Sequence, residues 1–120
     1  MDFDVPGLFS ELSALGAPER FDDLPFGLVA MRLDGTITAY NRYESECTGF
    51  SAAQCVGLNF FTDVGQCTNN FLVSGRFDEE TTLDETIDYV FTLKMRPTRV
   101  RLRLLKDEPS PHQFIAIQRR

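Results

Sequence analysis

Two neighbouring segments near the C-terminus alternate apolar and polar residues, and this pattern constrains the fold more than any other feature of the chain. In TIDYVFTLKM, residues 86–95, the large apolar side chains share one face: Ile87, Tyr89, Phe91, Leu93 and Met95. In PTRVRLRLL, residues 97–105, three arginines alternate with three apolar residues. The arginines are Arg99, Arg101 and Arg103, and the apolar residues are Val100, Leu102 and Leu104. A period of two is that of a β-strand, whose successive side chains point to opposite faces. Two such strands in succession predict an antiparallel sheet.

The rest of the chain supplies the remaining elements. FGLVAMRL and TITAYN are β-prone runs on either side of Asp34-Gly35, a pair that favours a tight primed turn, so they predict a hairpin. HQFIAIQ, residues 112–118, predicts a last strand after a proline-marked turn. Helical segments are expected over residues 5–15, 42–56 and 71–79. This order predicts an α+β fold with a five-stranded antiparallel sheet whose short helices cover one face and enclose a pocket.

The first 23 residues are expected to form an N-terminal helical cap on a core of residues 24–120. Leu8, Leu12 and Leu15 fall at helical spacing, and a glycine and a proline then end the helix. A segment this short cannot bury a core of its own. We interpret the sheet face with the arginines as too polar to be core, and expect the cap to lie against it or beside it.

The chain is acidic in total, but its charge is uneven. Its 120 residues have a net charge of −6; residues 1–23 hold six acidic residues and one basic one, whereas residues 94–120 hold eight basic and two acidic ones. The acidic total disfavours nucleic acid as a partner, so the arginine strand is interpreted as a solvated face. No apolar run has the length of a membrane span, and the N-terminus lacks the regions of a secretory signal. We therefore expect a cytoplasmic protein.

Three cysteines and one histidine limit the chemistry available to the chain. An odd number of cysteines without a secretory signal argues against a disulfide framework. The spacing of Cys47, Cys55 and Cys67 gives no zinc pattern, and His112 offers no obvious thiol–imidazole pair. No metal site and no enzyme activity are therefore expected. Cys67 stands in a glycine-containing bend, NFFTDVGQCT, where its thiol is either an inert buried group or a reactive, modified one.

The order of two strands, short helices and three strands is that of a PAS domain. Within this class, the chain from about residue 24 to residue 119 resembles the photoactive yellow proteins. The resemblance lies in the segments LPFGLVAMRLDGTITAYNRYESECTGF, VGLNFFTDVGQCT and KMRPTRV. Its most specific part is a set of residues that recurs in order: Tyr40, Glu44, Thr48-Gly49, Asn59-Phe60-Phe61 and Cys67-Thr68.

This resemblance implies a blue-light receptor that carries 4-hydroxycinnamic acid (p-coumaric acid) as a thioester on Cys67. It implies that Tyr40 and Glu44 bind the phenolate oxygen of the chromophore and that Thr48 supports the tyrosine. Phe91 and Met95 match residues that line the pocket, and Met95 matches one that assists thermal re-isomerisation. Trans–cis isomerisation would then lead to proton transfer from Glu44 and to partial unfolding, which signals to a partner.

The chemistry of these residues agrees with the implied roles. A buried phenolate needs charge-assisted hydrogen bonds, and Tyr40 offers one O–H donor. Glu44 is a second donor only if it is protonated, a state that burial and a neighbouring anion both favour. No cation stands near Glu44 in its motif, so its ionised form is expected to be an unpaired buried charge. Gly65 permits a close backbone approach before Cys67.

The chain departs from the family at two positions. Phe50 stands where the family commonly has an arginine that covers the chromophore, so we expect it to cover the pocket by apolar contact. Gln66 replaces a proline that commonly precedes the cysteine, which leaves the bend less rigid.

Two alternatives stay open. A flavin-binding LOV domain is one, although Gly57-Leu58-Asn59 is followed by Phe60 rather than the photoreactive cysteine. The other is a PAS module without a chromophore that binds a protein or another small ligand. We expect no output segment after Arg120 and therefore a separate, unidentified signalling partner. A monomer or weak dimer is expected.

Overall fold

A computed structural model describes residues 1–92 and 96–120, and one antiparallel sheet organises them. The sheet has five strands in the order β2-β1-β5-β4-β3, so β2 and β3 are its edges. Its strands are β1 (Gly27–Arg32), β2 (Ile37–Tyr40), β3 (Thr82–Phe91), β4 (Thr98–Asp107) and β5 (His112–Arg119). The α+β fold with a five-stranded antiparallel sheet is therefore confirmed.

The hairpin of β1 and β2 is confirmed, but its turn differs from the expected one. The amide of Gly35 donates to the carbonyl of Arg32, so Leu33 and Asp34 are the central residues. Gly35 follows them at φ +93°, a left-handed conformation that other residues adopt at a cost. The carboxylate of Asp34 accepts from the amide of Thr36 at 2.9 Å, which fixes this conformation. A three-residue connection, Leu33 to Gly35, that ends in a left-handed glycine therefore replaces the two-residue turn.

Strand β3 begins four residues before the expected start at residue 86. It pairs with β4 along its whole length, from Thr82 opposite Asp107 to Phe91 opposite Thr98. The polar start of the strand, with Asp84 in it, is compatible with this position because β3 is an edge strand with one solvated side. Pairing with the neighbouring strand thus decides where the strand begins.

Short helical segments connect β2 to β3, as expected. The helical segments are α1 (Leu8–Leu15), η1 (Pro18–Asp23), α2 (Arg42–Thr48), α3 (Ala52–Cys55), η2 (Phe60–Val64), η3 (Gln66–Thr68) and α4 (Ser74–Glu79). The predicted helix at 71–79 thus begins three residues later, at Ser74. No helix among the described residues is long and apolar enough to cross a membrane.

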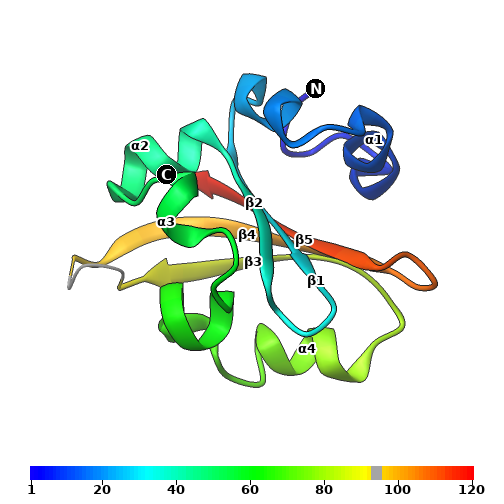
Figure 1. Ribbon diagram of the computed structural model, residues 1–120. Helices are drawn as coiled ribbons and strands as arrows, with labels where there is room; N and C mark the ends of the chain where they lie inside the picture. The colour runs from blue at the N-terminus through cyan, green and yellow to red at the C-terminus, as the bar shows by residue number, and fades with distance from the viewer. Residues whose placement is uncertain (93–95) are drawn as a thin grey trace.

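Apolar side chains pack on both faces of the sheet, which corrects one expectation. α1 lies on one side of the sheet and α4 on the other (Figure 1). The face that bears the arginines was expected to be too polar for a core. It carries a second apolar cluster in which Leu8 and Leu12 of α1 meet Leu28 and Phe114 of the sheet. The expectation fails because the arginines occupy β4 alone, whereas β1 and β5 present apolar residues on the same face.

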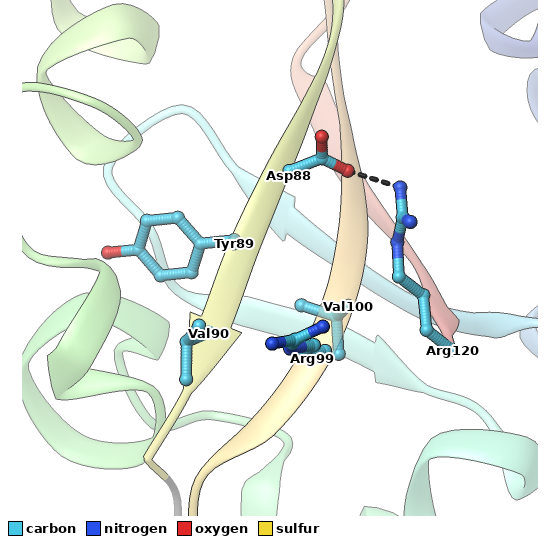
Figure 2. A pocket seen from close by; sticks show the side chains of 6 residues that line it. All are labelled: Asp88, Tyr89, Val90, Arg99, Val100 and Arg120. Carbon is cyan, nitrogen blue, oxygen red and sulfur yellow. Dashed lines mark hydrogen bonds and ion pairs between the residues drawn. The ribbon is translucent and has the colours of Figure 1, made fainter.

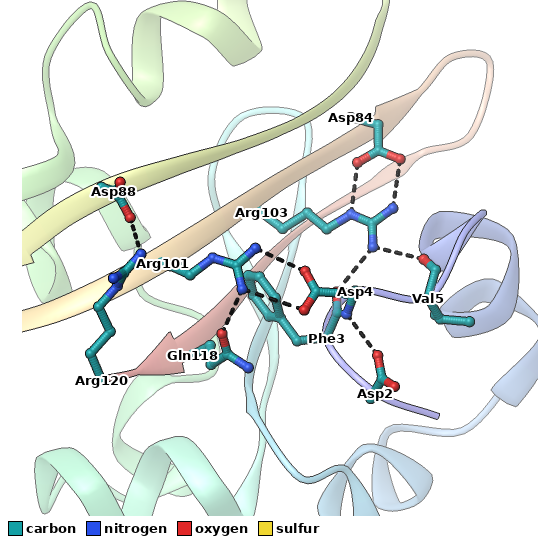
Figure 3. A network of polar contacts seen from close by, with 10 residues as sticks. All are labelled: Asp2, Phe3, Asp4, Val5, Asp84, Asp88, Arg101, Arg103, Gln118 and Arg120. Atoms are coloured by element: carbon teal, nitrogen blue, oxygen red, sulfur yellow. Dashed lines mark hydrogen bonds and ion pairs between the residues drawn. The ribbon is translucent and has the colours of Figure 1, made fainter.

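A polar network holds residues 2–5 against this face (Figure 3). The guanidinium of Arg103 donates to the carbonyls of Phe3 at 3.0 Å and Val5 at 2.7 Å, and also to both carboxylate oxygens of Asp84. Arg101 pairs with the carboxylate of Asp4 at 2.8 Å, and its guanidinium lies 5.1 Å from the ring centre of Phe3. The acidic N-terminal segment therefore lies against the arginine strand.

Candidate functional site

Tyr40 ends β2 and points into the core on the side of the sheet covered by α4. Its side chain is buried, and its hydroxyl lies 2.8 Å from Oγ1 of Thr48. The Thr48 hydroxyl has one proton, which it donates to the carbonyl of Glu44 at 3.0 Å. Tyr40 is therefore the donor to Thr48. Burial, and then the charge of Glu44, raise the pKa of Tyr40 above its usual value, so its hydroxyl stays neutral.

Glu44 is buried and has a cationic partner, which overturns the expectation of an unpaired carboxyl. Two N–H groups of Arg119 donate to its two carboxylate oxygens, at 2.6 and 3.1 Å. Burial disfavours the charged guanidinium of Arg119, but the hydrogen bond and charge of Glu44 outweigh it and raise the Arg119 pKa. The sequence missed this pair because the two residues are 75 positions apart.

Asn41 is a further residue that sequence reasoning missed. Its buried amide donates to the carbonyls of Phe21 and Phe26, and its oxygen accepts from the amides of Leu28 and Glu44. All four of its contacts lie between 2.9 and 3.1 Å. An asparagine directly before a predicted helix is a recognisable N-cap signal. Asn41 fixes the start of α2, and with it the place of Glu44.

The backbone of β1 leaves room for the Glu44 carboxyl only because residue 27 is glycine. A Cβ at Gly27 would lie 2.2 Å from Oε1 of Glu44. This distance is far below van der Waals contact, so any larger residue would displace the carboxyl. Gly27 and Arg119 together define where the carboxyl lies.

Cys67 lies on η3, in a loop that several hydrogen bonds hold in place. Its backbone carbonyl accepts from the hydroxyl of Tyr89 at 2.5 Å and from the side-chain amide of Asn70 at 3.2 Å. A Cβ at Gly65 would lie 2.6 Å from Cζ of Phe60, so the expected close approach of the backbone at Gly65 is present. The loop thus presents Cys67 from a defined backbone position.

The predicted site residues converge on one apolar cluster. Tyr40 and Phe91 are buried within it, and the partly buried side chains of Phe50 and Cys67 pack against it. Thr48 joins the group through its hydrogen bond to Tyr40. Met95, the remaining predicted residue, lies outside the described residues, so its role stays a prediction.

A pocket of about 350 Å³ adjoins this cluster between α2 and the ends of β3, β4 and β5. It is lined by Glu46, Cys47, Thr48, Gly49, Phe91, Arg96, Thr98 and Arg119. A pocket on the helical side of the sheet was expected. Of its lining residues, Thr48 and Phe91 are predicted site residues and Arg119 contacts Glu44.

The side chains of β3 point alternately to its two sides (Figure 2). Asp88 meets Arg120 on one side of the strand, whereas Tyr89 points to the opposite side.

The three thiols differ in their surroundings. Burial raises the pKa of the Cys55 thiol, and the charge of Glu44 adds to this effect. Partial desolvation also raises the pKa of the Cys47 thiol, although the residue as a whole is exposed. Since the thiolate is the reactive form, both environments reduce reactivity. Within residues 1–92 and 96–120 no three potential ligands gather as a metal site.

Comparisons with known proteins agree on one family, although no family model matches the chain. The chain is 36% identical over 103 residues to the photoactive yellow protein of Rhodothalassium salexigens, covering 83% of this chain and 82% of that protein. It is 32% identical over 104 residues to the photoactive yellow protein of Halochromatium salexigens, covering 84% and 83%.

Solved structures give the same result. The photoactive yellow protein domain of the sensor histidine kinase Ppr from Rhodospirillum centenum superposes with a TM-score of 0.77 at 36% identity, covering 85% of this chain and 92% of that chain. The Rhodobacter sphaeroides LOV protein superposes with a TM-score of 0.67 at 14% identity, covering 90% and 67%. At this identity, the likeness to the LOV protein shows the PAS fold alone.

Proposed function

The chain belongs to the photoactive yellow protein family, and on this premise we propose that it is a blue-light receptor with 4-hydroxycinnamic acid bound as a thioester to Cys67. The observation that supports this most is that the Cys67 side chain packs against the same cluster as Tyr40, Phe50 and Phe91. The donor set fits a phenolic group, because a buried hydroxyl and a buried carboxyl lie close to this cluster.

Each residue has a role that follows from its position. When bound, the chromophore supplies light absorption and trans–cis isomerisation. Tyr40 turns its O–H from Thr48 toward the phenolic oxygen, while Thr48 holds the tyrosine ring in place. Glu44 holds a proton at its carboxyl in the dark and releases it after illumination. Phe50 and Phe91 exclude water from the pocket by apolar contact, and Met95 has the pocket-lining role that the family resemblance implies for it.

The signal is proposed to pass to a separate protein by a change of conformation. The relatives found are photoreceptors or sensor domains, and one of them is a domain of a sensor histidine kinase. In the dark, the N-terminal cap of residues 1–23 is held by its apolar contacts and by Arg101 and Arg103. Light is proposed to loosen this cap and expose the apolar surface beneath it.

Loading of the purified chain with activated p-coumarate tests the proposal. We expect one adduct by mass spectrometry, on the peptide that contains Cys67, and a visible absorption band that bleaches in blue light. Cys47→Ala and Cys55→Ala are the matched controls and should load as the wild type does. Loading that survives Cys67→Ala would refute the assignment. A chain that stays colourless after loading would favour a chromophore-free PAS module.

A further inference from the structure

Arg119 is the last residue of the central strand β5, and its side chain contacts Glu44 of α2. Its side chain is 17% exposed and that of Glu44 is 2% exposed, so the ion pair between them is largely withdrawn from water. The contact uses both guanidinium N–H groups and both carboxylate oxygens. Such a two-point contact fixes the orientation of the carboxyl as well as its charge.

The same guanidinium also has a small electrostatic effect on the hydroxyl that is proposed to bind the chromophore. The charge of Arg119 acts on Tyr40 in the direction opposite to that of Glu44. Arg119 also lines the pocket together with Thr48 and Phe91. One cation therefore lies at the junction of the buried carboxyl, the buried tyrosine and the pocket.

From this geometry we infer that Arg119 is the counterion of the chromophore site and balances a single negative charge shared by two acids. The charge resides on Glu44 when its carboxyl is ionised, and on the phenolic oxygen of the bound group when Glu44 holds the proton. One proton distinguishes the two states, and the total charge is the same in both. This inference rests on the proposed function and adds a residue that the family motif does not contain.

Other ionisable groups near the pair do not take this role. They are Tyr40 on β2, Glu46 and Cys47 on α2, Cys55 on α3, and Arg96 beside the pocket. The two thiols and the tyrosine are neutral, since their pKa values lie above the usual ones. Arg96 lines the pocket and is exposed, whereas Arg119 contacts the carboxyl directly.

A resident counterion changes what happens when Glu44 releases its proton. An unpaired buried carboxylate would destabilise the fold strongly. With Arg119 already in contact, the ionised carboxyl has a partner, so proton release by itself disturbs the fold less. The counterion thus limits the conformational response to proton release.

The unloaded chain provides the first test, through the pH dependence of the denaturant midpoint. Arg119→Met leaves the Glu44 carboxyl buried without a cation, so the folded state is favoured only while this carboxyl is protonated. The denaturant midpoint should therefore fall as the pH rises from 5 to 8, above the range in which carboxyls usually titrate. Arg119→Met combined with Glu44→Gln should remove this dependence. Arg120→Met is the matched control, because Arg120 forms an exposed ion pair with Asp88 on the side of β3 opposite to Tyr89 (Figure 2). Equal pH profiles for Arg119→Met and Arg120→Met would overturn the inference.

The loaded chain provides the second test, through titration of the phenolic group by its absorption. Arg119→Met removes the cation, so the pH at which half of the phenolic group is ionised should rise by at least about one unit. This corresponds to a tenfold change in its ionisation constant. Arg119→Lys keeps the charge but loses the two-point contact, so it should shift the midpoint less, and it serves if Arg119→Met does not fold. An unchanged midpoint in both variants would overturn the inference. Failure of the wild type to load would instead refute the proposed function, while the unloaded test would still decide the pairing.

Discussion

The hydroxyl of Tyr89 donates a 2.5 Å hydrogen bond to the backbone carbonyl of Cys67. It joins the edge strand β3 to the loop that carries the proposed attachment site, 22 residues earlier in the chain. The same hydroxyl accepts from the side-chain amide of Asn70 at 2.7 Å. A strand side chain thereby fixes the backbone on which the thiol is presented.

Tyr89→Phe should loosen the loop around Cys67. The substitution removes the shorter of the two hydrogen bonds to the Cys67 carbonyl and leaves the one from Asn70, so it should lower the free energy of unfolding by about 1 kcal/mol. Hydrogen exchange should show lost protection in residues 65–70 with little change in the sheet. Tyr43→Phe on α2 is the matched control and should stay within about 0.5 kcal/mol of the wild type. Equal effects of the two variants would remove the special role of Tyr89.

Gly27→Ala should displace the carboxyl of Glu44. The added Cβ would lie 2.2 Å from Oε1, and such overpacking costs about 1–3 kcal/mol. Urea unfolding measures the loss, and Glu44→Ala in the same chain should relieve the steric part of it. Gly75→Ala on α4 is the control, since its Cβ would meet its nearest neighbour at an ordinary 3.4 Å. If Gly27→Ala is as stable as Gly75→Ala, the close approach is not a constraint.

Arg103→Met should release the N-terminal segment from the sheet. The substitution leaves the carbonyls of Phe3 and Val5 without their donor, and it should cost about 2 kcal/mol. Hydrogen exchange should then show lost protection in α1. Arg99→Met lies on the same face of the same strand but is exposed, so it should change little. If α1 stays protected in Arg103→Met, the apolar contacts of α1 are enough to hold the N-terminal segment on the sheet without Arg103.

Acid should weaken the ion pair between Asp4 and Arg101. The hydrogen bond from Arg101 lowers the pKa of Asp4 below its ordinary 3.8. A lowered folded-state pKa gives stability that is present above the ordinary pKa and is lost as the pH falls below it. The denaturant midpoints of wild type and Asp4→Asn should therefore differ slightly at pH 6 and converge as the pH falls below about 4. A difference that persists at low pH would show that Asp4 acts through something other than its charge.

Illumination of the loaded chain should alter the cap more than the rest of the surface. Residues 1–23 are held on the surface of the sheet by an apolar cluster and by two arginines, so we expect them to detach before the sheet itself opens. Hydrogen exchange in dark and light should show lost protection in residues 8–15. A change confined to residues 42–67 would show that another segment carries the signal. Because Arg119 pairs with Glu44, the loss should be larger in Arg119→Met than in the wild type.

The local elements could be predicted because each depends on a short pattern. Alternation indicated β3 and β4, and Asp34-Gly35 indicated the hairpin, although the predicted type of its turn was wrong. The start of β3 was misplaced since it depends on pairing with β4 rather than on its own apolar residues. The sequence did not predict the apolar cluster on the face that bears the arginines, because the apolar residues of this face come from β1 and β5 rather than from the arginine strand β4.

The order of elements, the family, and the residues proposed to bind the chromophore could all be predicted from the amino-acid sequence. These depend on residue types at short spacing along the chain. The partners of those residues and of the N-terminal segment depend on the folded chain: Arg119 for Glu44, Tyr89 for the Cys67 carbonyl, and Arg103 for the N-terminal segment. Each partner lies on a strand far from its residue in sequence, and folding of the sheet brings them together. Hydrogen bonds and ion pairs act over a few ångströms in space, so no pattern along the chain records them.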